Sequence, residues 1–351
     1  MATREGKRGS GLVTAVIPAG VETARDLVGP ALEAAIARLS PDIRPVAGYH
    51  LGLCDADGKP SGTAVGGKAL RPALTLLSAR AAGAPAERAV PAAVAVELVH
   101  NFSLLHDDIM DGDTERRHRP TAWTVFGIGP AILAGDALQS LANDLLLEGP
   151  APQAVWAARC LAAAVQRLIS GQGADLAFER RDHVTVDECL DMAADKTAAL
   201  MACACSIGAI YVGAPAATAM SLTAFGAYIG LAFQLTDDLL GIWGAPEVTG
   251  KPVRSDLRSR KKSLPIVAAL ASESDAGRDL AALLAAAEPL SEEDLCRAAE
   301  LVAKAGGRKW VEAEADNALG SALSCLDEAD LPEDVRAEFA AIAEFVTARQ
   351  W

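Results

Sequence analysis

The chain is poor in aromatic residues, which make up 4% of its 351 residues, and it has few runs of β-branched side chains. Strands are enriched in both kinds of residue, so this composition argues against a β-sheet protein. Ala and Leu are abundant, which favours helix. We find no convincing strand alternation and no repeat of fixed period.

Basic charge is also scarce, since 32 Lys and Arg against 46 Asp and Glu give a formal net charge of −14. A nucleic-acid partner would need a concentrated basic face, and we therefore expect none. The basic residues that do cluster, at 116–119 and 258–262, lie close to aspartates. This arrangement indicates a local anion site beside bound cations.

Paired cysteines and long apolar runs are missing as well. The seven cysteines form no C-x-x-C pair, which is typical of reduced, mostly buried thiols in a cytoplasmic protein. The five histidines form no H-x-x-x-H pattern, so we expect no zinc site. No segment reaches the roughly 18 uninterrupted apolar residues of a membrane span, and residues 1–20 do not read as a signal peptide. We therefore predict a cytoplasmic protein without a membrane span.

Helical patterns separated by short breaks run from residue 24 almost to the end of the sequence. The breaks, such as GAPAER, GIGP and EGPAPQ, contain the Gly and Pro residues that end helices. With 51% hydrophobic residues the chain can form one large core. We predict a disordered tail over 1–20 and a single all-α domain over 21–351, a bundle of about ten or more helices.

The stretch LLHDDIMDGDTERRHRPT, residues 104–121, contains the spacing D-D-x-x-D. Asp107 and Asp111 share one helical face, and Asp108 lies beside them. Like charges at this spacing repel unless divalent cations neutralise them, and oxygen-only ligands suit Mg²⁺. Taken alone, the motif is equally typical of an exposed acidic helix end.

The surroundings of this motif favour a binding site. His100 lies seven residues before Asp107 and returns to nearly the same face of the helix. Arg116, Arg117 and Arg119 follow, and forked guanidinium groups are suited to phosphate. A lone histidine is more often a core residue, but here we interpret His100 as a phosphate contact.

A second acidic pair occurs in LAFQLTDDLLGIWG, where Gln234, Asp237 and Asp238 lie on one helical face. A buried apolar helix has no structural need for two adjacent carboxylates. The next segment, TGKPVRSDLRSRKKSLP, includes Lys251 and Lys261. A run of charge is usually a surface loop, but its position here favours a loop that closes over phosphate.

Three shorter motifs carry further candidates. GGKALRPAL places Lys68 and Arg71 one helical turn apart. DKTAAL contains Lys196 and Thr197, and a lysine in an apolar helix needs an anionic partner. GQGADL is either a plain helix segment or support for the site.

In this order the six motifs resemble those of the trans-isoprenyl diphosphate synthases, from about residue 24 to at least residue 270. The resemblance implies an all-helical isoprenoid-synthase-type bundle around a deep central cavity, usually as a homodimer. It also implies condensation of isopentenyl diphosphate with an allylic diphosphate (dimethylallyl, geranyl or farnesyl), and about three Mg²⁺ ions per active site.

The resemblance also implies a role for each candidate residue. The metal ligands would be Asp107, Asp108, Asp111, Asp237 and Asp238. The residues that hold the allylic diphosphate would be Arg116, Lys196, Lys251 and Lys261. Isopentenyl diphosphate would be held by Lys68, Arg71, His100 and Arg117. Thr197 and Gln234 would place oxygen dipoles near the developing allylic cation.

Three positions depart from the family pattern. Gly241 stands where a third aspartate of the second motif is expected, and Arg254 and His118 stand where glycine is common. We expect an active enzyme with a demanding Mg²⁺ requirement. The alternatives are a terpene cyclase of the same helical class and a non-catalytic subunit of an active synthase.

By the same resemblance, the floor of the cavity lies just before the first aspartates. Phe102 is five and Ser103 four residues before Asp107, which implies a cavity of intermediate depth. We therefore expect mainly geranylgeranyl diphosphate, with farnesyl diphosphate next and longer polyprenyl products as a further alternative. Ordinary helix packing is the other interpretation of Phe102.

Overall fold

The computed structural model describes residues 18–61, 69–245 and 253–347. Two predicted site residues, Lys68 and Lys251, lie outside the described residues, as does most of the predicted tail. The first helix begins at Ala19, so it overlaps the last two positions of that tail.

The described residues form a helical bundle, which confirms the predicted all-α fold. The first elements are α1 (Ala19–Ala37), α2 (Arg44–Leu51), α3 (Leu70–Ala81), the 3₁₀ helix η1 (Ala86–Ala89), α4 (Val90–Met110), and the strands β1 (Glu115–Arg116) and β2 (Arg119–Pro120). The middle elements are α5 (Ala122–Phe126), α6 (Ile128–Leu147), α7 (Gln153–Phe178), α8 (Val186–Ala193), the π-helical segment η2 (Ala194–Ala198), α9 (Ala199–Val212) and α10 (Ala216–Trp243). The last elements are α12 (Ser255–Arg258), α13 (Leu264–Ala271), α14 (Asp275–Leu284), α15 (Glu292–Lys304), α16 (Gly307–Asp327) and α17 (Glu333–Thr347).

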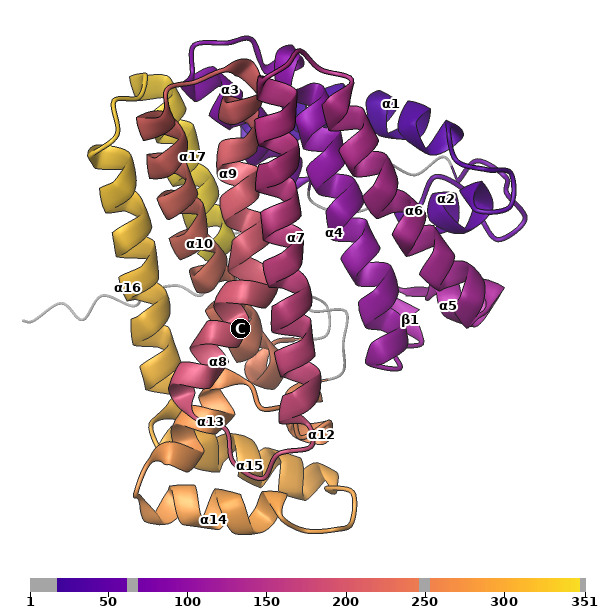
Figure 1. Cartoon of the computed structure of the whole chain (residues 1–351). Helices are drawn as coiled ribbons and strands as arrows, with labels where there is room; N and C mark the ends of the chain where they lie inside the picture. The colour runs from indigo at the N-terminus through magenta and orange to yellow at the C-terminus, as the bar shows by residue number, and fades with distance from the viewer. Residues whose placement is uncertain (1–17, 62–68, 246–252, 348–351) are drawn as a thin grey trace, which may run out of the picture.

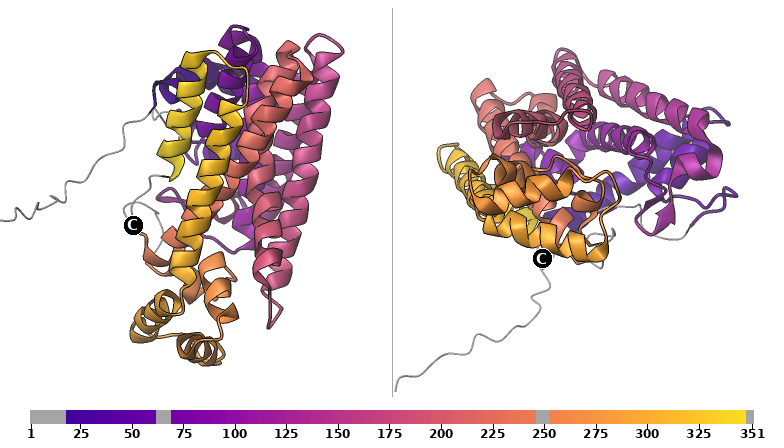
Figure 2. Two further views of the ribbon diagram at one scale, coloured as in Figure 1. Left: turned by 90° about the vertical axis from the view of Figure 1, so that its left-hand side faces the viewer. Right: turned by 90° about the horizontal axis from the view of Figure 1, so that it is seen from below.

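The long helices lie side by side, and the shorter helices α12 to α15 gather at one end of them (Figure 1). The side view in Figure 2 shows α14 and α15 running across the ends of the long helices. Helix α9 is buried along nearly its whole length, with only Ile210 and Val212 half-buried. A helix that is apolar on every side belongs inside the protein. The fold therefore carries the segment just before α9, with Lys196 and Thr197, into the interior.

Strands β1 and β2 form a small antiparallel hairpin, whereas the sequence showed no convincing strand. Each strand has only two residues, which is too short for an alternating pattern to be visible. Arg116 pairs with Arg119, and Arg117 and His118 form the turn with φ angles of 53° and 60°. Positive φ at both central residues matches the right-handed twist of a two-residue hairpin.

Three of the described helices are long and apolar enough to cross a membrane, judged by length and composition alone. They are Ala86–Met110, Val186–Val212 and Ala216–Trp243. The prediction of no membrane span was based on uninterrupted apolar runs, a stricter criterion than length and composition, and it stays a prediction. The bundle buries 72% of the apolar window in each of the first two helices and 33% in the third. Much of this apolar character therefore serves the core.

Candidate active site

A central cavity of about 420 Å³ opens where α3, α4, α7, η2 and α10 meet. Its lining brings together most of the predicted site residues: Arg71, His100, Ser103, Asp107, Arg116, Arg117, Lys196, Thr197, Gln234 and Asp237. The first carboxylate of each acidic motif, Asp107 and Asp237, therefore faces the same cavity although 130 positions separate them.

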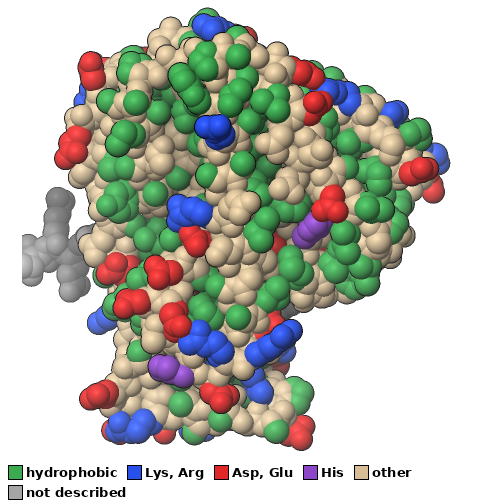
Figure 3. All heavy atoms as spheres, viewed as in Figure 1, with side chains coloured by type: hydrophobic (Ala, Val, Ile, Leu, Met, Phe, Trp, Pro, Cys, Tyr) green, Lys and Arg blue, Asp and Glu red, His purple; other side chains and the backbone are tan. Residues whose placement is uncertain are grey.

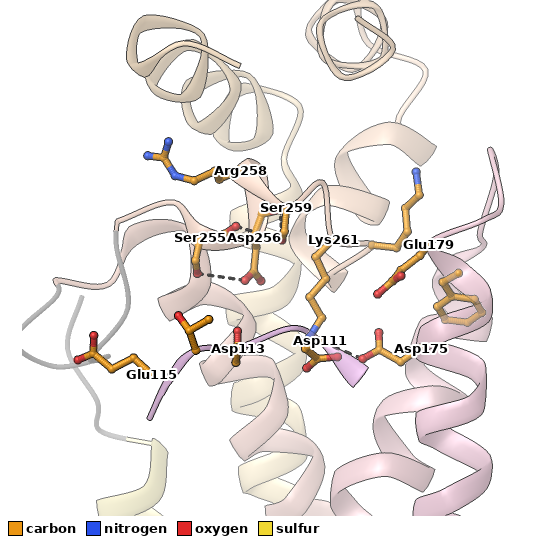
Figure 4. A pocket seen from close by; sticks show the side chains of 13 residues that line it. Asp111, Asp113, Glu115, Asp175, Glu179, Ser255, Asp256, Arg258, Ser259 and Lys261 are labelled. Carbon is orange, nitrogen blue, oxygen red and sulfur yellow. Dashed lines mark hydrogen bonds and ion pairs between the residues drawn. The ribbon is translucent and has the colours of Figure 1, made fainter. Parts of the chain in front are cut away.

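A second hollow, the acidic cavity, has a volume of about 540 Å³. Its charged lining consists of Asp111, Asp113, Glu115, Asp175, Glu179 and Asp256 with Arg258, Lys261 and Lys262 (Figure 4). Six carboxylates against three cations leave an excess of negative charge, which raises the local concentration of cations. Asp107 lies in the last turn of α4 and Asp111 is the C-cap of that helix, so this helix end contributes one carboxylate to each cavity.

Asp175 on α7 lies between two lysines. Lys196 Nζ is 2.5 Å and Lys261 Nζ 3.7 Å from Asp175 Oδ2. Burial opposes ionisation of Asp175, but the two lysines together hold the pKa of its carboxyl below the usual value. This contact confirms that Lys196 has an anionic partner, and it connects the linings of the two cavities.

The backbone geometry of η2 determines where Lys196 points. A π-helical turn inside a run of α-helix commonly marks a functional site. Helix α7 passes close to this turn at Gly171, where a Cβ atom would collide with Lys196 N and lie 2.7 Å from Lys196 Cα. Only glycine allows this approach, which explains the first residue of the GQGADL motif.

Thr197 and Gln234 form a fixed pair of polar groups in the central cavity. Thr197 Oγ1 donates to Gln234 Oε1 at 2.6 Å, and Gln234 Nε2 donates to Asp238 Oδ1 at 2.7 Å. The second bond fixes the orientation of the amide, so its oxygen is turned toward Thr197.

The three aspartates of the first motif have different surroundings. Burial raises the pKa of Asp107 to about 6 although Lys196 partly offsets it, and Asp111 adds to the rise. The side chain of Asp108 is almost completely buried, and Arg116 Nε donates to Asp108 Oδ1 at 2.6 Å. The structure thus pairs Asp108, which we predicted to bind a metal ion, with Arg116, which we predicted to bind the allylic diphosphate.

Asp238 also differs from its predicted role as a metal ligand. Its Oδ1 accepts from Gln234 Nε2, and its Oδ2 accepts from the backbone N–H of Leu264 at 2.9 Å. Burial and the nearby Asp256 carboxylate raise the pKa of Asp238 to about 7. Both oxygens are engaged by protein groups, so Asp238 joins α10 to the first turn of α13.

The residues predicted to hold isopentenyl diphosphate lie together on one side of the central cavity. Arg71 Nη1 is 3.3 Å from His100 Nε2. Burial and the guanidinium groups of Arg71 and Arg117 hold the pKa of His100 well below its usual value. His100 is therefore neutral, and the two arginines supply the positive charge that a phosphate requires.

Next to this group, the hairpin residues Arg116, Arg117 and Arg119 line a smaller pocket of about 180 Å³ with Tyr49 and His50. The Arg119 guanidinium lies 4.4 Å from the centre of the Tyr49 ring, in a cation–π contact. The hairpin is thus held against α2 while its arginines face the cavities.

The two residues predicted to set product length are placed differently. Ser103 lines the central cavity, and its hydroxyl donates to His100 O. Phe102 is buried beside His106, with ring centres 4.9 Å apart, and is not among the residues that line the cavity. The packing interpretation of Phe102 therefore fits the structure better than the floor assignment.

Two further residues line the site: Gln172, for which support of the site was one of two open interpretations, and Asp256, to which we assigned no role. Gln172 lines the central cavity and is 5% exposed, and its amide atoms have no hydrogen-bond partner in the described part of the chain. Its place beside Gly171 was a usable signal. Asp256 lines the acidic cavity; it lies in the quoted segment TGKPVRSDLRSRKKSLP, in which only the lysines were given a role.

The described residues include no group of three His, Cys, Asp or Glu side chains able to hold a metal ion. Mg²⁺ does not need such a cage, because it is usually bound by one or two carboxylates, several waters and substrate phosphate oxygens. Asp107, Asp111 and Asp237 beside Lys196 and Lys261 fit a metal ion that arrives with a diphosphate.

A polyprenyl synthetase family model matches residues 60–302. The chain is 49% identical to the (2E,6E)-farnesyl diphosphate synthase of Mycobacterium tuberculosis over 330 residues, which cover 93% of this chain and 92% of that protein. It is 47% identical to the geranylgeranyl diphosphate synthase of the same organism over 311 residues, 88% of each. The crystal structure of a polyprenyl synthetase from Streptomyces coelicolor superposes with a TM-score of 0.90 and 51% identity, covering 94% of this chain and 99% of that one. The chain therefore belongs to the polyprenyl synthetase family of prenyl-transferring enzymes.

Proposed function

We propose that this enzyme condenses isopentenyl diphosphate with an allylic diphosphate and releases mainly geranylgeranyl diphosphate. The observation that carries the proposal is the shared cavity of Asp107 and Asp237, with Lys196 in the same lining. Two carboxylates and a lysine at the mouth of one partly apolar cavity suit a diphosphate that leaves with its metal ions.

The allylic diphosphate binds where carboxylates and cations alternate. Asp107, Asp111 and Asp237 would hold Mg²⁺, which when bound neutralises the charge that the diphosphate acquires as it leaves. Lys196 and Lys261, which both contact Asp175 in this structure, turn to the diphosphate oxygens. Arg116 completes the set from the hairpin, and Lys251 keeps its predicted role outside the described residues.

Isopentenyl diphosphate binds on the opposite, cationic side of the cavity. Arg71 and Arg117 donate to its phosphate oxygens, and neutral His100 accepts from Arg71 and orients it. This second cationic group favours a synthase over a terpene cyclase, which needs only one diphosphate site.

Bond formation takes place in the apolar part of the cavity. The allylic C–O bond breaks, the double bond of isopentenyl diphosphate attacks the allylic carbon, and one proton is lost to the departing diphosphate. The hydroxyl of Thr197 and the amide oxygen of Gln234 stabilise the positive charge through their dipoles. The apolar lining, which includes Leu168, Leu200 and Phe233, excludes water from the cation.

Farnesyl diphosphate is the second candidate product, because the farnesyl diphosphate synthase is 49% identical to this chain and the geranylgeranyl diphosphate synthase 47%. The decisive assay supplies radiolabelled isopentenyl diphosphate with dimethylallyl, geranyl or farnesyl diphosphate and measures product length by chromatography. We expect a twenty-carbon product from each primer. A fifteen-carbon end product would replace the first candidate by the second, and a hydrocarbon from geranylgeranyl diphosphate alone would identify a cyclase.

The cavity wall at Ser103 offers a direct test of length control. Ser103→Phe places a ring in the lining of the central cavity, so we expect the product to shorten by at least one five-carbon unit. Phe102→Ala serves as the comparison, because Phe102 packs against His106 instead. An unchanged product length with Ser103→Phe would contradict the proposed path of the chain.

We also propose that the enzyme is a cytoplasmic homodimer. Large apolar side chains are exposed on α6 and α7, including Leu133 at 57% and Trp156 at 53%. Figure 3 shows hydrophobic side chains on the face of the molecule that these two helices form. A second copy that covers this face would remove that apolar surface from water. Asp237 and Asp238, near the end of α10, would be costly inside a bilayer, which favours a cytoplasmic location.

A further inference from the structure

Two cysteines face each other across neighbouring helices of the bundle. Helices α7 and α9 pack against each other (Figure 1). Cys160 of α7 and Cys203 of α9 bring their Sγ atoms to 3.8 Å, although 43 positions separate them in the sequence. All seven cysteines lie within the described residues and are free thiols. The fold therefore creates a reduced pair of thiols that the spacing of cysteines along the chain did not show.

The two helices are in close contact on both sides of this pair. On one side, a Cβ atom on Gly171 of α7 would collide with Lys196 N. On the other side, a Cβ atom on Gly213, the C-cap of α9, would lie 3.3 Å from Gln153 Nε2 at the start of α7. The helices are thus held together at both ends of the shared stretch. A disulfide requires the two sulfur atoms to approach to about 2.05 Å, and this packing keeps them near each other.

The two thiols differ in their exposure to solvent. Cys160 is half-buried, whereas Cys203 is buried at 3% exposed. A thiol that reacts reversibly with oxidants is typically accessible and has a second cysteine close by, which converts its first oxidation product into a disulfide. Cys160 suits the first of these roles, and Cys203 suits the second.

The thiols also differ in how readily they ionise, and the thiolate is the reactive form. The hydrogen bond with Cys203 lowers the pKa of Cys160, with a contribution from Ser206, while burial opposes the change. Burial raises the pKa of Cys189 to about 12, and it also raises the pKa of Cys205. Cys160 therefore forms a thiolate more easily than these two buried cysteines do.

We propose that Cys160 and Cys203 form a site of reversible oxidation, at which hydrogen peroxide converts the two thiols into a disulfide that joins α7 to α9. The Cys160 thiolate attacks one peroxide oxygen, the O–O bond breaks, and hydroxide leaves while the sulfur becomes a sulfenic acid. The sulfur of Cys203 then attacks this sulfur, the S–O bond breaks, and the departing hydroxide takes the thiol proton. The two thiols lose two electrons in all, and the peroxide gains them and ends as two molecules of water.

The disulfide would act on the stability of the bundle. A covalent link between α7 and α9 restricts the unfolded chain and so favours the folded one. Thiol–disulfide exchange with a small-molecule thiol restores both cysteines. In the cytoplasm, where we place the enzyme, disulfides are usually transient, which agrees with a reversible site. The oxidation involves no substrate of the proposed reaction, so its test does not depend on turnover.

The first experiment treats the folded full chain with about one equivalent of hydrogen peroxide, blocks the remaining thiols by alkylation and maps unreduced peptides by mass spectrometry. We expect a disulfide between Cys160 and Cys203 and the loss of two of the seven thiols. Cys160→Ala should not form it, whereas Cys325→Ala, which removes another half-buried cysteine, should form it as the original chain does. Oxidation of the exposed Cys296 while Cys160 and Cys203 stay reduced would overturn the inference.

The second experiment detects the intermediate. In Cys203→Ala the sulfenic acid of Cys160 has no thiol to react with, so labelling of Cys160 by dimedone should rise at least about tenfold over the original chain. If this variant does not fold, the peptide map of the original chain decides the question.

Thermal unfolding shows whether the disulfide belongs to the folded protein. The oxidised original chain should melt about 3 °C or more above the reduced chain, and dithiothreitol should reverse the shift. A disulfide found only in protein that melts below the reduced chain would show that it forms after unfolding, which would contradict the proposal.

Discussion

At the scale of single residues, one backbone feature is common to the two positions at which this chain lacks the glycine of the family motifs. His118 and Arg254 both have positive φ, 60° and 62°, which is the conformation that glycine adopts most readily. A left-handed conformation costs a residue with a side chain roughly 1–2 kcal/mol. The chain has therefore kept the backbone shape of both motifs and carries the strain at these positions.

The hairpin turn allows this strain to be measured. We expect His118→Gly to raise the free energy of unfolding by about 0.5–1 kcal/mol, because relief of the strain exceeds the added flexibility of glycine in the unfolded chain. Urea denaturation measures the difference. His183→Gly, at an exposed loop residue without positive φ, is the control and should destabilise. A loss of stability in both variants would contradict the strain.

His50 should make stability depend on pH. Burial, with Arg116 and Arg117 nearby, lowers the pKa of His50 from 6.5 to about 3. Between these values the unfolded chain binds a proton that the folded chain does not, so stability is fully present above pH 6.5 and is lost as the pH falls. The contribution amounts to about 2 kcal/mol between pH 8 and pH 5.

Urea denaturation at pH 8 and at pH 5 tests this contribution by comparing His50→Gln with the original chain. The variant should lose less stability over this range, since glutamine does not titrate. An equal loss in both proteins would show that other groups dominate.

At the scale of elements, the close approach of α7 to η2 positions Lys196 and Thr197. We expect Gly171→Ala to destabilise the protein by about 1–3 kcal/mol, because its Cβ has no room beside the Lys196 backbone. Product formation should fall with it, since Lys196 and Thr197 would be displaced.

Gly173→Ala is the matched control for this change. It lies in the same helix and motif, and a Cβ there meets nothing within 4 Å. Alanine favours helix over glycine, so this variant should be stabilised by about 0.5–1 kcal/mol. Thermal unfolding and the elongation assay together distinguish the two variants, and equal behaviour would argue against a role of the contact.

The elements also show what could be predicted from the sequence. The helices and the residues that share their faces follow from periodicity, which is why Asp107 and Asp237 were found. The β hairpin was missed because Arg117 and His118 replace the Asn-Gly that usually marks such a turn. Asp256 lies in a quoted motif, but its close approach to Gly241 could not be predicted, because a loop separates the two residues and no local pattern reports such a contact.

At the scale of the whole molecule, the bundle separates two electrostatic environments around one reaction. Arg71, Arg116 and Arg117 line the central cavity, whereas six carboxylates line the acidic cavity. The motifs predicted most of the charged residues of the central cavity but, in the acidic cavity, only Asp111 and Lys261. The spacing of the motifs could not predict how these residues divide between two cavities, because that depends on packing. For the same reason it could not predict that Asp108 and Asp238 form hydrogen bonds inside the protein.

The apolar face of α6 and α7 should determine the oligomeric state. We expect Leu133→Glu with Trp156→Glu to weaken dimerisation by at least about tenfold, because charges replace large apolar contacts. Analytical ultracentrifugation measures the mass. Met220→Glu replaces another exposed apolar residue, 71% exposed on α10, and should leave the dimer intact. A monomeric original chain, or dissociation only by Met220→Glu, would contradict this assignment.

The carboxylate of Asp175 has a consequence for turnover. It pairs with both Lys196 and Lys261 in the free protein, so under the proposed function it competes with diphosphate for these two lysines. Each released diphosphate can be displaced by a group that never leaves the protein. Under the proposed function, this competition would favour release of the diphosphate by-product between successive additions.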